Sequence, residues 1–237
     1  MQWTSMTSPV WMKARDGYLC ASEIAPLAKK YSRSKPETLR SMGKLKAKKL
    51  ADVAPDPMSY GDAAKGHICE PYAVASFNEH ANAPEVMFHY DDLLVVRNGI
   101  GWSPDAMDIL QAVPADCVIQ SEDIDPTACL EVKSYGPEHY YEASRTPDKL
   151  KLDERWQVAA AMYVCPTIET GYLLFYCPEI HEATLFPFDR KELDVEINTV
   201  NELREMWDSV DVLEIPASRQ VWKVEESIES LWIRSNL

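Results

Sequence analysis

The chain has 237 residues, of which 46% are hydrophobic and 26% charged, and its formal net charge is −14. A chain of this length and composition can bury a sizeable core, which excludes an intrinsically disordered protein. It contains no apolar run of about 18 residues and no apolar signal core at its start, so we expect a cytoplasmic protein that neither spans a membrane nor is secreted.

The first 81 residues carry mainly helix signals. A first helix is expected over "ASEIAPLAKKY", from about Ser22. A second is expected after Ser34, because Ser34 and Glu37 form an S-x-x-E capping box and Pro36 suits a first turn. After a loop over 51–62, "AAKGHICEPYAVASFNEHA" predicts a third, longer helix.

Short runs rich in Val, Ile and aromatic residues follow, and they predict an antiparallel meander. These runs are "EVMFHY", "LLVVRN", "GWSPDAMDIL" and "ACLEVKS". The break over 111–127 is too long for a tight hairpin and is expected to be an exposed acidic loop. "LDERWQVAAAMYVC" then predicts a helix, "TGYLLFYCPEIHEATLFPF" a hairpin, and the ranges 189–210 and 217–233 two closing helices.

This order of elements predicts one mixed α/β domain over 1–237, with a basic helical segment at about 1–50 and helices over about 189–237. Residues 1–50 contain 11 Lys and Arg against 3 Asp and Glu, whereas the rest of the chain contains 13 against 35. Nine of the basic residues lie between 29 and 49. Such a run can hold phosphates, although a solvated basic helix is an equally ordinary interpretation.

The cysteines and histidines do not form a recognisable metal motif. The six cysteines occur singly, with no Cys-x-x-Cys pair, and the five histidines are scattered. We therefore predict buried, reduced thiols rather than a metal–thiolate cluster.

The triplet Glu131-Val132-Lys133 is the first candidate for chemistry. Alternation along a strand places Glu131 and Lys133 on the same face. The triplet by itself is weak evidence, because Asp189-Arg190-Lys191 also matches the pattern at an expected helix start. An ion pair on an exposed face of the sheet is the competing interpretation.

Asp105 strengthens the catalytic interpretation, because it ends a short run about one hairpin before Glu131. Two carboxylates on neighbouring strands can share a Mg²⁺ ion, for which Mn²⁺ can substitute, and the backbone carbonyl of Val132 is a further candidate ligand. Lys133 beside such a site can orient or deprotonate a metal-bound water. Asp108 alternates to another face and is a weaker candidate. The spacing predicts metal-assisted attack of water on a phosphodiester.

Four stretches resemble a known group of enzymes. "SPDAMD" with "CLEVKS" looks like the core of the PD-(D/E)XK nucleases. Three further stretches are similar to phage-lambda-type alkaline exonucleases, the YqaJ-like viral recombinase family: "WMKARDGYLCASEIAPL", "KGHICEPYAVASFNEH" and "RWQVAAAMYV". Together they cover roughly residues 11–177 in the family's order. The resemblance implies a restriction-endonuclease-like core, with a central mixed, mainly antiparallel sheet flanked by helices.

The resemblance also implies residue roles. Asp105 and Glu131 would be the metal-binding carboxylates and Lys133 the catalytic lysine. Glu70 would complete or support the metal site from the upstream helix, and Gln157 would help hold the lysine or the water. Glu70 and Gln157 each have an ordinary alternative, as a surface acid and as a plain helix residue.

Two N-terminal residues match positions that hold the 5′-phosphate of a DNA end in such exonucleases. These are Arg15, whose planar fork suits a phosphate, and Ser22 at a helix N-terminus. Arg15 could instead pair with Asp16 or Glu23.

The activity implied is a Mg²⁺-dependent exonuclease that degrades linear double-stranded DNA from its ends, in the 5′-to-3′ direction. It would leave a single strand for an annealing protein, and three subunits would encircle the DNA. Ala106 replaces a family glycine and Ala159 a family glutamine, and the loop 111–127 is long, but no metal ligand is lost. A PD-(D/E)XK endonuclease without end dependence and a non-catalytic acidic DNA mimic are the alternatives.

Overall fold

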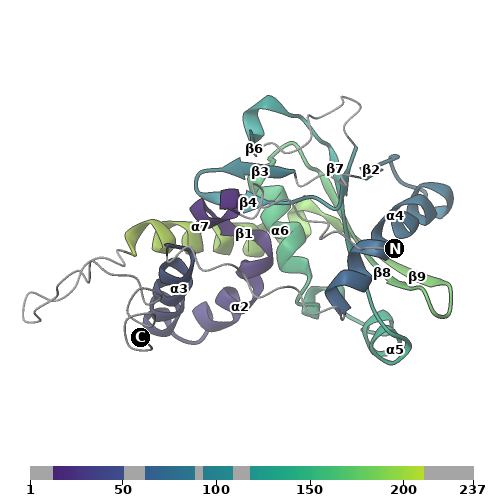
Figure 1. Cartoon of the computed structure of the whole chain (residues 1–237), viewed down its shortest axis with the longest axis horizontal. Coiled ribbons are helices and arrows are strands. Elements are labelled where there is room, and N and C mark those ends of the chain that lie inside the picture. The colour runs from purple at the N-terminus through teal and green to yellow at the C-terminus, as the bar shows by residue number, and fades with distance from the viewer. Residues whose placement is uncertain (1–12, 51–61, 89–92, 109–117, 211–237) are drawn as a thin grey trace, which may run out of the picture.

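The computed structural model describes residues 13–50, 62–88, 93–108 and 118–210. Within these ranges the chain forms two mixed sheets flanked by helices, which confirms the mixed α/β class (Figure 1). No helix in the described ranges is long and apolar enough to cross a membrane. The helix expected over 217–233 lies outside the described residues.

The N-terminal part is helical, as predicted. It comprises the 3-10 turn η1 (Arg15–Gly17), strand β1 (Leu19–Cys20), and helices α2 (Ala21–Tyr31), α3 (Lys35–Leu50) and α4 (Asp62–His80). Helix α2 begins after Cys20, whose N–H donates to the Glu23 carboxylate at 2.8 Å. Helix α3 begins after Ser34, whose Oγ accepts the N–H of Glu37 at 3.4 Å. Side-chain acceptors of this kind satisfy amides that a first helical turn leaves unpaired.

The smaller sheet has the strand order β1-β4-β3-β6. Its other strands are β3 (Leu94–Arg97), β4 (Ile100–Trp102) and β6 (Val118–Gln120). Strands β3 and β4 form a hairpin whose turn residues, Asn98 and Gly99, both have positive φ, as tight hairpins require. The exposed loop predicted over 111–127 is wrong at its C-terminal side, because 118–120 pairs in parallel with β3 and the 3-10 turn η2 (Ser121–Asp123) follows.

The larger sheet has the strand order β2-β5-β7-β8-β9. Its strands are β2 (Met87–Phe88), β5 (Ala106–Met107), β7 (Ala128–Ser134), β8 (Thr170–Cys177) and β9 (Glu182–Asp189). The predicted β8–β9 hairpin is confirmed. The predicted meander is interrupted, because "GWSPDAMDIL" contributes β4 to one sheet and β5 to the other. Residues 103–105 therefore carry the chain from sheet to sheet.

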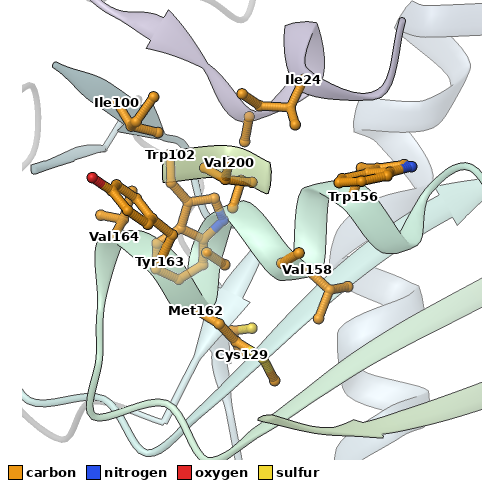
Figure 2. Packing of buried hydrophobic residues seen from close by; sticks show 14 of the residues in the cluster. Ile24, Ile100, Trp102, Cys129, Trp156, Val158, Met162, Tyr163, Val164 and Val200 are labelled. Atoms are coloured by element: carbon orange, nitrogen blue, oxygen red, sulfur yellow. The ribbon is translucent and has the colours of Figure 1, made fainter. Parts of the chain in front are cut away.

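Strands β7 and β8 are parallel, so a crossover connection must join them. The crossover contains α5 (Pro137–Ser144), the 3-10 turn η3 (Lys149–Lys151) and the predicted helix α6 (Arg155–Val164). Figure 2 shows Ile24, Ile100 and Val200 gathered on one side of α6, with Cys129 of β7 on the other. Helix α6 therefore lies in the core, which explains why eight of its ten residues are buried.

The two faces of β7 are covered by different helices. Cys129 packs in the cluster that contains α6, whereas Leu130 and Val132 pack with Phe77 of α4. Helix α6 approaches the sheet so closely that a Cβ at Gly171 would lie 2.2 Å from Val158 Cγ1, so only glycine fits there. By alternation, the odd-numbered residues of β7 face α6.

Helix α7 (Asp194–Ser209), preceded by the 3-10 turn η4 (Arg190–Leu193), confirms the helix predicted over 189–210. Its side chains Val200, Leu203 and Trp207 are buried against the α2 and α6 region. Figure 1 shows α2, α3 and α7 grouped at one end of the protein and the larger sheet with α4 and α5 at the other.

The cysteine thiols that the structure describes are buried, as the sequence predicted. Burial raises the pKa of Cys165 to about 12, and burial with the neighbouring Glu131 carboxylate raises the pKa of Cys129 well above its ordinary value. Both thiols stay protonated at neutral pH, which makes them poor nucleophiles and metal ligands. Cys117 lies outside the described residues.

Candidate active site

Asp105 lies where the chain enters the larger sheet, directly before β5. Ala106 pairs with Leu130 of β7, so one step back along β5 corresponds to Glu131 on β7. Beyond this pair of residues, the Asp105 side chain takes the place of a backbone acceptor, because its Oδ2 accepts the N–H of Val132 at 2.7 Å. The structure thus places the two predicted carboxylates on neighbouring strands.

Glu131 and Lys133 form a contact on one face of β7. The Lys133 Nζ lies 2.5 Å from Glu131 Oε1, as expected for side chains two residues apart on a strand. Glu131 is only 8% exposed, and the side chain of Lys133 is 25% exposed. The alternative of an ion pair on an exposed face is therefore wrong.

The charges at this point are crowded and poorly solvated. Burial and the negative charge of Glu131 raise the pKa of Asp105 well above its ordinary value, against the opposing effects of Lys133 and the Val132 N–H. Burial lowers the pKa of Lys133, but attraction to Glu131, Asp105 and Glu70 outweighs it, so the net shift is upward. Lys133 is therefore an ammonium over the whole physiological range of pH.

The donor groups fit a hard cation with few protein ligands. In the part of the chain that the structure describes, no three His, Cys, Asp or Glu side chains are grouped closely enough to hold a metal. Glu70 of α4 lies near enough for its charge to raise the pKa of both Asp105 and Lys133. Mg²⁺ commonly binds through one or two carboxylates and keeps several waters. In a strand, the N–H and carbonyl of one residue point the same way, so the Val132 carbonyl also faces Asp105. Carboxylate and carbonyl oxygens are donors that suit hard divalent cations such as Mg²⁺ and Mn²⁺.

Gln157 of α6 lies over the same face of β7. Val158 is near Gly171 and Cys129 at the start of the strands, whereas Glu154 contacts Tyr135 just beyond the end of β7. Gln157 lies between Glu154 and Val158 along α6, which covers the face of β7 that carries Glu131 and Lys133. Its Oε1 is buried and accepts no hydrogen bond from the described residues.

The Tyr135–Glu154 contact was not anticipated from the sequence. The Tyr135 hydroxyl donates to Glu154 Oε1 at 2.5 Å, and burial with this hydrogen bond raises the pKa of Tyr135. Alternation that places Glu131 and Lys133 on one face of β7 also places Tyr135 there, so half of the contact was predictable. The partner, 19 residues later, could not be found without the crossover geometry.

Arg15 and Ser22, predicted to hold a 5′-phosphate, contact one another. The Arg15 guanidinium donates to Ser22 Oγ at 3.1 Å, and Ser22 lies exposed in the first turn of α2. Glu23, the alternative partner of Arg15, accepts the N–H of Cys20 and lies 3.0 Å from Lys49 Nζ. A donor fork and a hydroxyl at the start of a helix are the groups that phosphate sites use.

Comparison with known proteins bears on the fold. No family model and no curated protein matches the sequence. The crystal structure of the alkaline exonuclease LHK-Exo from Laribacter hongkongensis matches with a TM-score of 0.57 and 18% identity, over 85% of this chain and 95% of that one. Its complex with dAMP matches with a TM-score of 0.54, the same identity and the same coverage.

The chain has the fold of an alkaline exonuclease. The restriction-endonuclease-like architecture expected from the sequence is confirmed. At 18% identity the likeness concerns the fold, so the roles of the site residues rest on their own geometry.

Within this alkaline-exonuclease fold, Asp108 has a structural position. Its carboxylate accepts the N–H groups of Thr127 and Ala128, at 2.8 and 2.9 Å, and the Thr127 hydroxyl. It therefore fixes the start of β7, on which the candidate site is built.

Five of the six basic residues of α3 divide into two sets, and the sixth, Lys35, lies over the Tyr31 ring. Lys46 donates to the carbonyls of Trp207 and Val210 at the end of α7, and Lys49 donates to the carbonyls of Arg15 and Tyr18. These two lysines are structural. Three others, Arg40, Lys44 and Lys48, are exposed at intervals of four residues and form no ion pair within the described ranges. We call these three the α3 ridge.

Proposed function

We propose that this protein is a metal-dependent deoxyribonuclease that degrades linear double-stranded DNA from its ends. The observation that carries the proposal is that Asp105, just before β5, lies beside Glu131 and Lys133 of β7, in a chain that has the fold of an alkaline exonuclease. None of these three charged side chains contributes to an apolar core.

In the proposed reaction, Asp105 and Glu131 hold Mg²⁺ or Mn²⁺, with the Val132 carbonyl beside them. When bound, the cation would activate water and neutralise charge on the phosphate. Lys133, held beside Glu131, would orient or deprotonate the attacking water and stabilise the negative charge that develops on the phosphate.

Arg15 and Ser22 are proposed to bind the 5′-phosphate of the DNA end, which sets a 5′-to-3′ direction. Their contact supports this assignment, because each holds the other where both can donate to one phosphate. Lys49 ties α3 to the turn that carries Arg15, so the basic helix lies next to this pair.

The α3 ridge is proposed to contact the DNA backbone. Like charges four residues apart destabilise a helix slightly, so three cations in a row that lack an acidic partner among the described residues are better explained by an anionic ligand. By the helical rise, the ridge extends for about 12 Å, so its three cations lie about 6 Å apart along α3. Positive charge gathered here and acidic surface elsewhere would explain how a protein of net charge −14 holds DNA.

The biological setting proposed is recombination by single-strand annealing in the cytoplasm. The digested end would leave a single strand for an annealing protein, and three copies of the chain would surround the duplex with residues 29–49 toward the channel. Light scattering at micromolar concentration tests the assembly, and a monomer would contradict the ring.

The decisive experiment compares linear 5′-phosphorylated duplex with closed-circular duplex in Mg²⁺. Wild-type protein should degrade the linear DNA alone. Cutting of both substrates would replace the proposal with an endonuclease. If neither is cut and calorimetry shows no binding of Mg²⁺ or Mn²⁺, the acidic DNA mimic becomes the better account.

A further inference from the structure

The hydrogen bond between Tyr135 and Glu154 joins the catalytic strand to the helix that carries Gln157. Tyr135 lies two residues after Lys133, on the face of β7 that α6 covers, and its N–H donates to the Tyr176 carbonyl of β8 at 2.9 Å. Its ring packs against Phe175 and His139, with centroids 5.1 and 4.5 Å apart. The phenol is therefore held rigidly by the sheet.

Glu154 is the residue that precedes the first turn of α6. Its side chain makes no capping hydrogen bond to the helix, so helix capping does not account for it. The Glu154 carbonyl accepts the N–H of Gln157 at 2.9 Å, so a shift of Glu154 is transmitted to Gln157 within one turn. Two other contacts fix this end of α6, namely Arg155 with Glu196 and Lys29 with Asp153. Both of these lead to other helices, away from β7.

The buried Oε1 of Gln157 is an acceptor that finds no donor among the described residues. A buried acceptor without a donor costs about 1–3 kcal/mol, so its retention calls for a donor supplied during function. Lys133 lies on the face of β7 that α6 covers, and it has two ammonium protons beyond the one directed at Glu131. Whether the Gln157 side chain can contact Lys133 or the attacking water depends on the position of the first turn of α6.

We propose that Tyr135 and Glu154 are positioning residues, which set the place of Gln157 over the Glu131–Lys133 pair. This inference rests on the proposed nuclease function and extends it to two residues outside the reacting groups. Misplacement of Gln157 would slow the chemical step without changing how DNA is held, because neither Tyr135 nor Glu154 belongs to the proposed DNA-binding residues.

The test uses steady-state digestion of linear 5′-phosphorylated duplex in Mg²⁺. Tyr135→Phe and Glu154→Ala should lower kcat, by up to about 10²-fold, with KM unchanged. Glu154→Gln keeps an acceptor for the phenol and should recover most of the rate. In a Gln157→Ala background, Tyr135→Phe should have no further effect, because the two changes remove one function.

Tyr140→Phe is the matched control. Tyr140 is buried and bonds Thr184 Oγ1 through its hydroxyl, with the oxygens 2.8 Å apart, but it reaches β9 and not α6. Both Phe variants should lower thermal stability by similar amounts, and only Tyr135→Phe should lower kcat.

Two results would overturn the positioning role while leaving the nuclease proposal in place. One is wild-type kcat in Tyr135→Phe, and the other is an equal loss of kcat in Tyr135→Phe and Tyr140→Phe. An inactive wild type would overturn the nuclease proposal and this role with it.

Discussion

The charged residues of β7 and of α3 show how burial changes what a charge can do. On β7, Glu131 and Lys133 are largely buried, lie 2.5 Å apart, and share their surroundings with Asp105. On α3, Arg40, Lys44 and Lys48 are exposed and have no acidic partner in the described part of the chain. The first group acts over a few ångströms in a medium of low dielectric, whereas the second acts through solvent and is screened by salt.

This contrast assigns a different measurement to each region. Changes on β7 should alter the chemical step, the binding of the cation and the response to pH. Changes on α3 should alter the affinity for DNA and its dependence on salt, with little effect on the rate once DNA is bound. A variant in one region that produced the other region's effect would contradict this division.

The largest effect is expected for Lys133→Ala. Loss of the ammonium removes charge stabilisation at the phosphate, so the single-turnover rate on linear duplex should fall by about 10²–10⁴-fold. Lys191→Ala is the control, since Lys191 is exposed on η4 and far along the chain from β7. A rate within threefold of wild type in Lys133→Ala would remove this lysine from the mechanism.

The second effect concerns the α3 ridge. Arg40→Gln/Lys44→Gln/Lys48→Gln should weaken binding to duplex in EDTA, and the slope of log K against log salt should fall by roughly 0.9 for each phosphate that the variant no longer neutralises. Lys44→Gln alone should reduce this slope by about 0.9, the change expected for one phosphate. Lys191→Gln removes one exposed lysine outside the ridge and should leave the slope unchanged. Equal slopes in the triple variant and wild type would contradict a DNA-binding ridge.

The third effect is on stability without metal. The raised pKa of Asp105 means that the folded protein loses stability as pH rises from the ordinary value of 3.8 through the folded-state value. Asp105→Asn should therefore unfold at a higher temperature than wild type in EDTA at pH 8, and the difference should disappear near pH 4. Mg²⁺ should stabilise the wild type, by about 2.7 kcal/mol at 100 times Kd, and not the variant. A destabilised Asp105→Asn in EDTA at pH 8 would contradict a raised pKa of Asp105, which burial and the Glu131 charge cause.

The smallest effect is expected at a second Lys–Glu pair. Lys149 Nζ lies 2.8 Å from Glu192 Oε2, but the two side chains are 29% and 39% exposed. The hydrogen bond from Lys149 and the Asp189 N–H lower the pKa of Glu192, so its stabilising contribution is present above the ordinary value of 4.5 and lost as pH falls below it. Glu192→Gln should cost under about 1 kcal/mol in urea unfolding at pH 7, and activity should not change. If Glu192→Gln destabilised the protein as much as a change that disrupts the Glu131–Lys133 pair, burial would not explain the difference between the two pairs.

Local patterns predicted much of the fold and part of the site. The capping signal at Ser34, the periodicity of 152–165 and the alternation of 128–134 depend on near neighbours, and the elements they predicted are present. Asp105 was placed beside Glu131 because Pro104 ends one run and the next strand returns antiparallel.

What the sequence could not predict depends on contacts between distant segments. The division of 100–107 between two sheets and the pairing of 118–120 with β3 arise from the packing of whole sheets. The Tyr135–Glu154 contact requires the crossover that folds α6 back over β7. The division of the basic run into structural lysines and the α3 ridge depends on carbonyls at the end of α7 and near Arg15.

The most direct test of the central claim is the release of nucleotides from linear 5′-phosphorylated duplex by wild type and by Glu131→Gln, each in Mg²⁺ and in EDTA. Glu131→Gln preserves the shape of the side chain and removes the charge that would hold the cation. Release is expected only from wild type in Mg²⁺. Release by Glu131→Gln at the wild-type rate, or by wild type in EDTA, would contradict a metal-dependent nuclease site on β7.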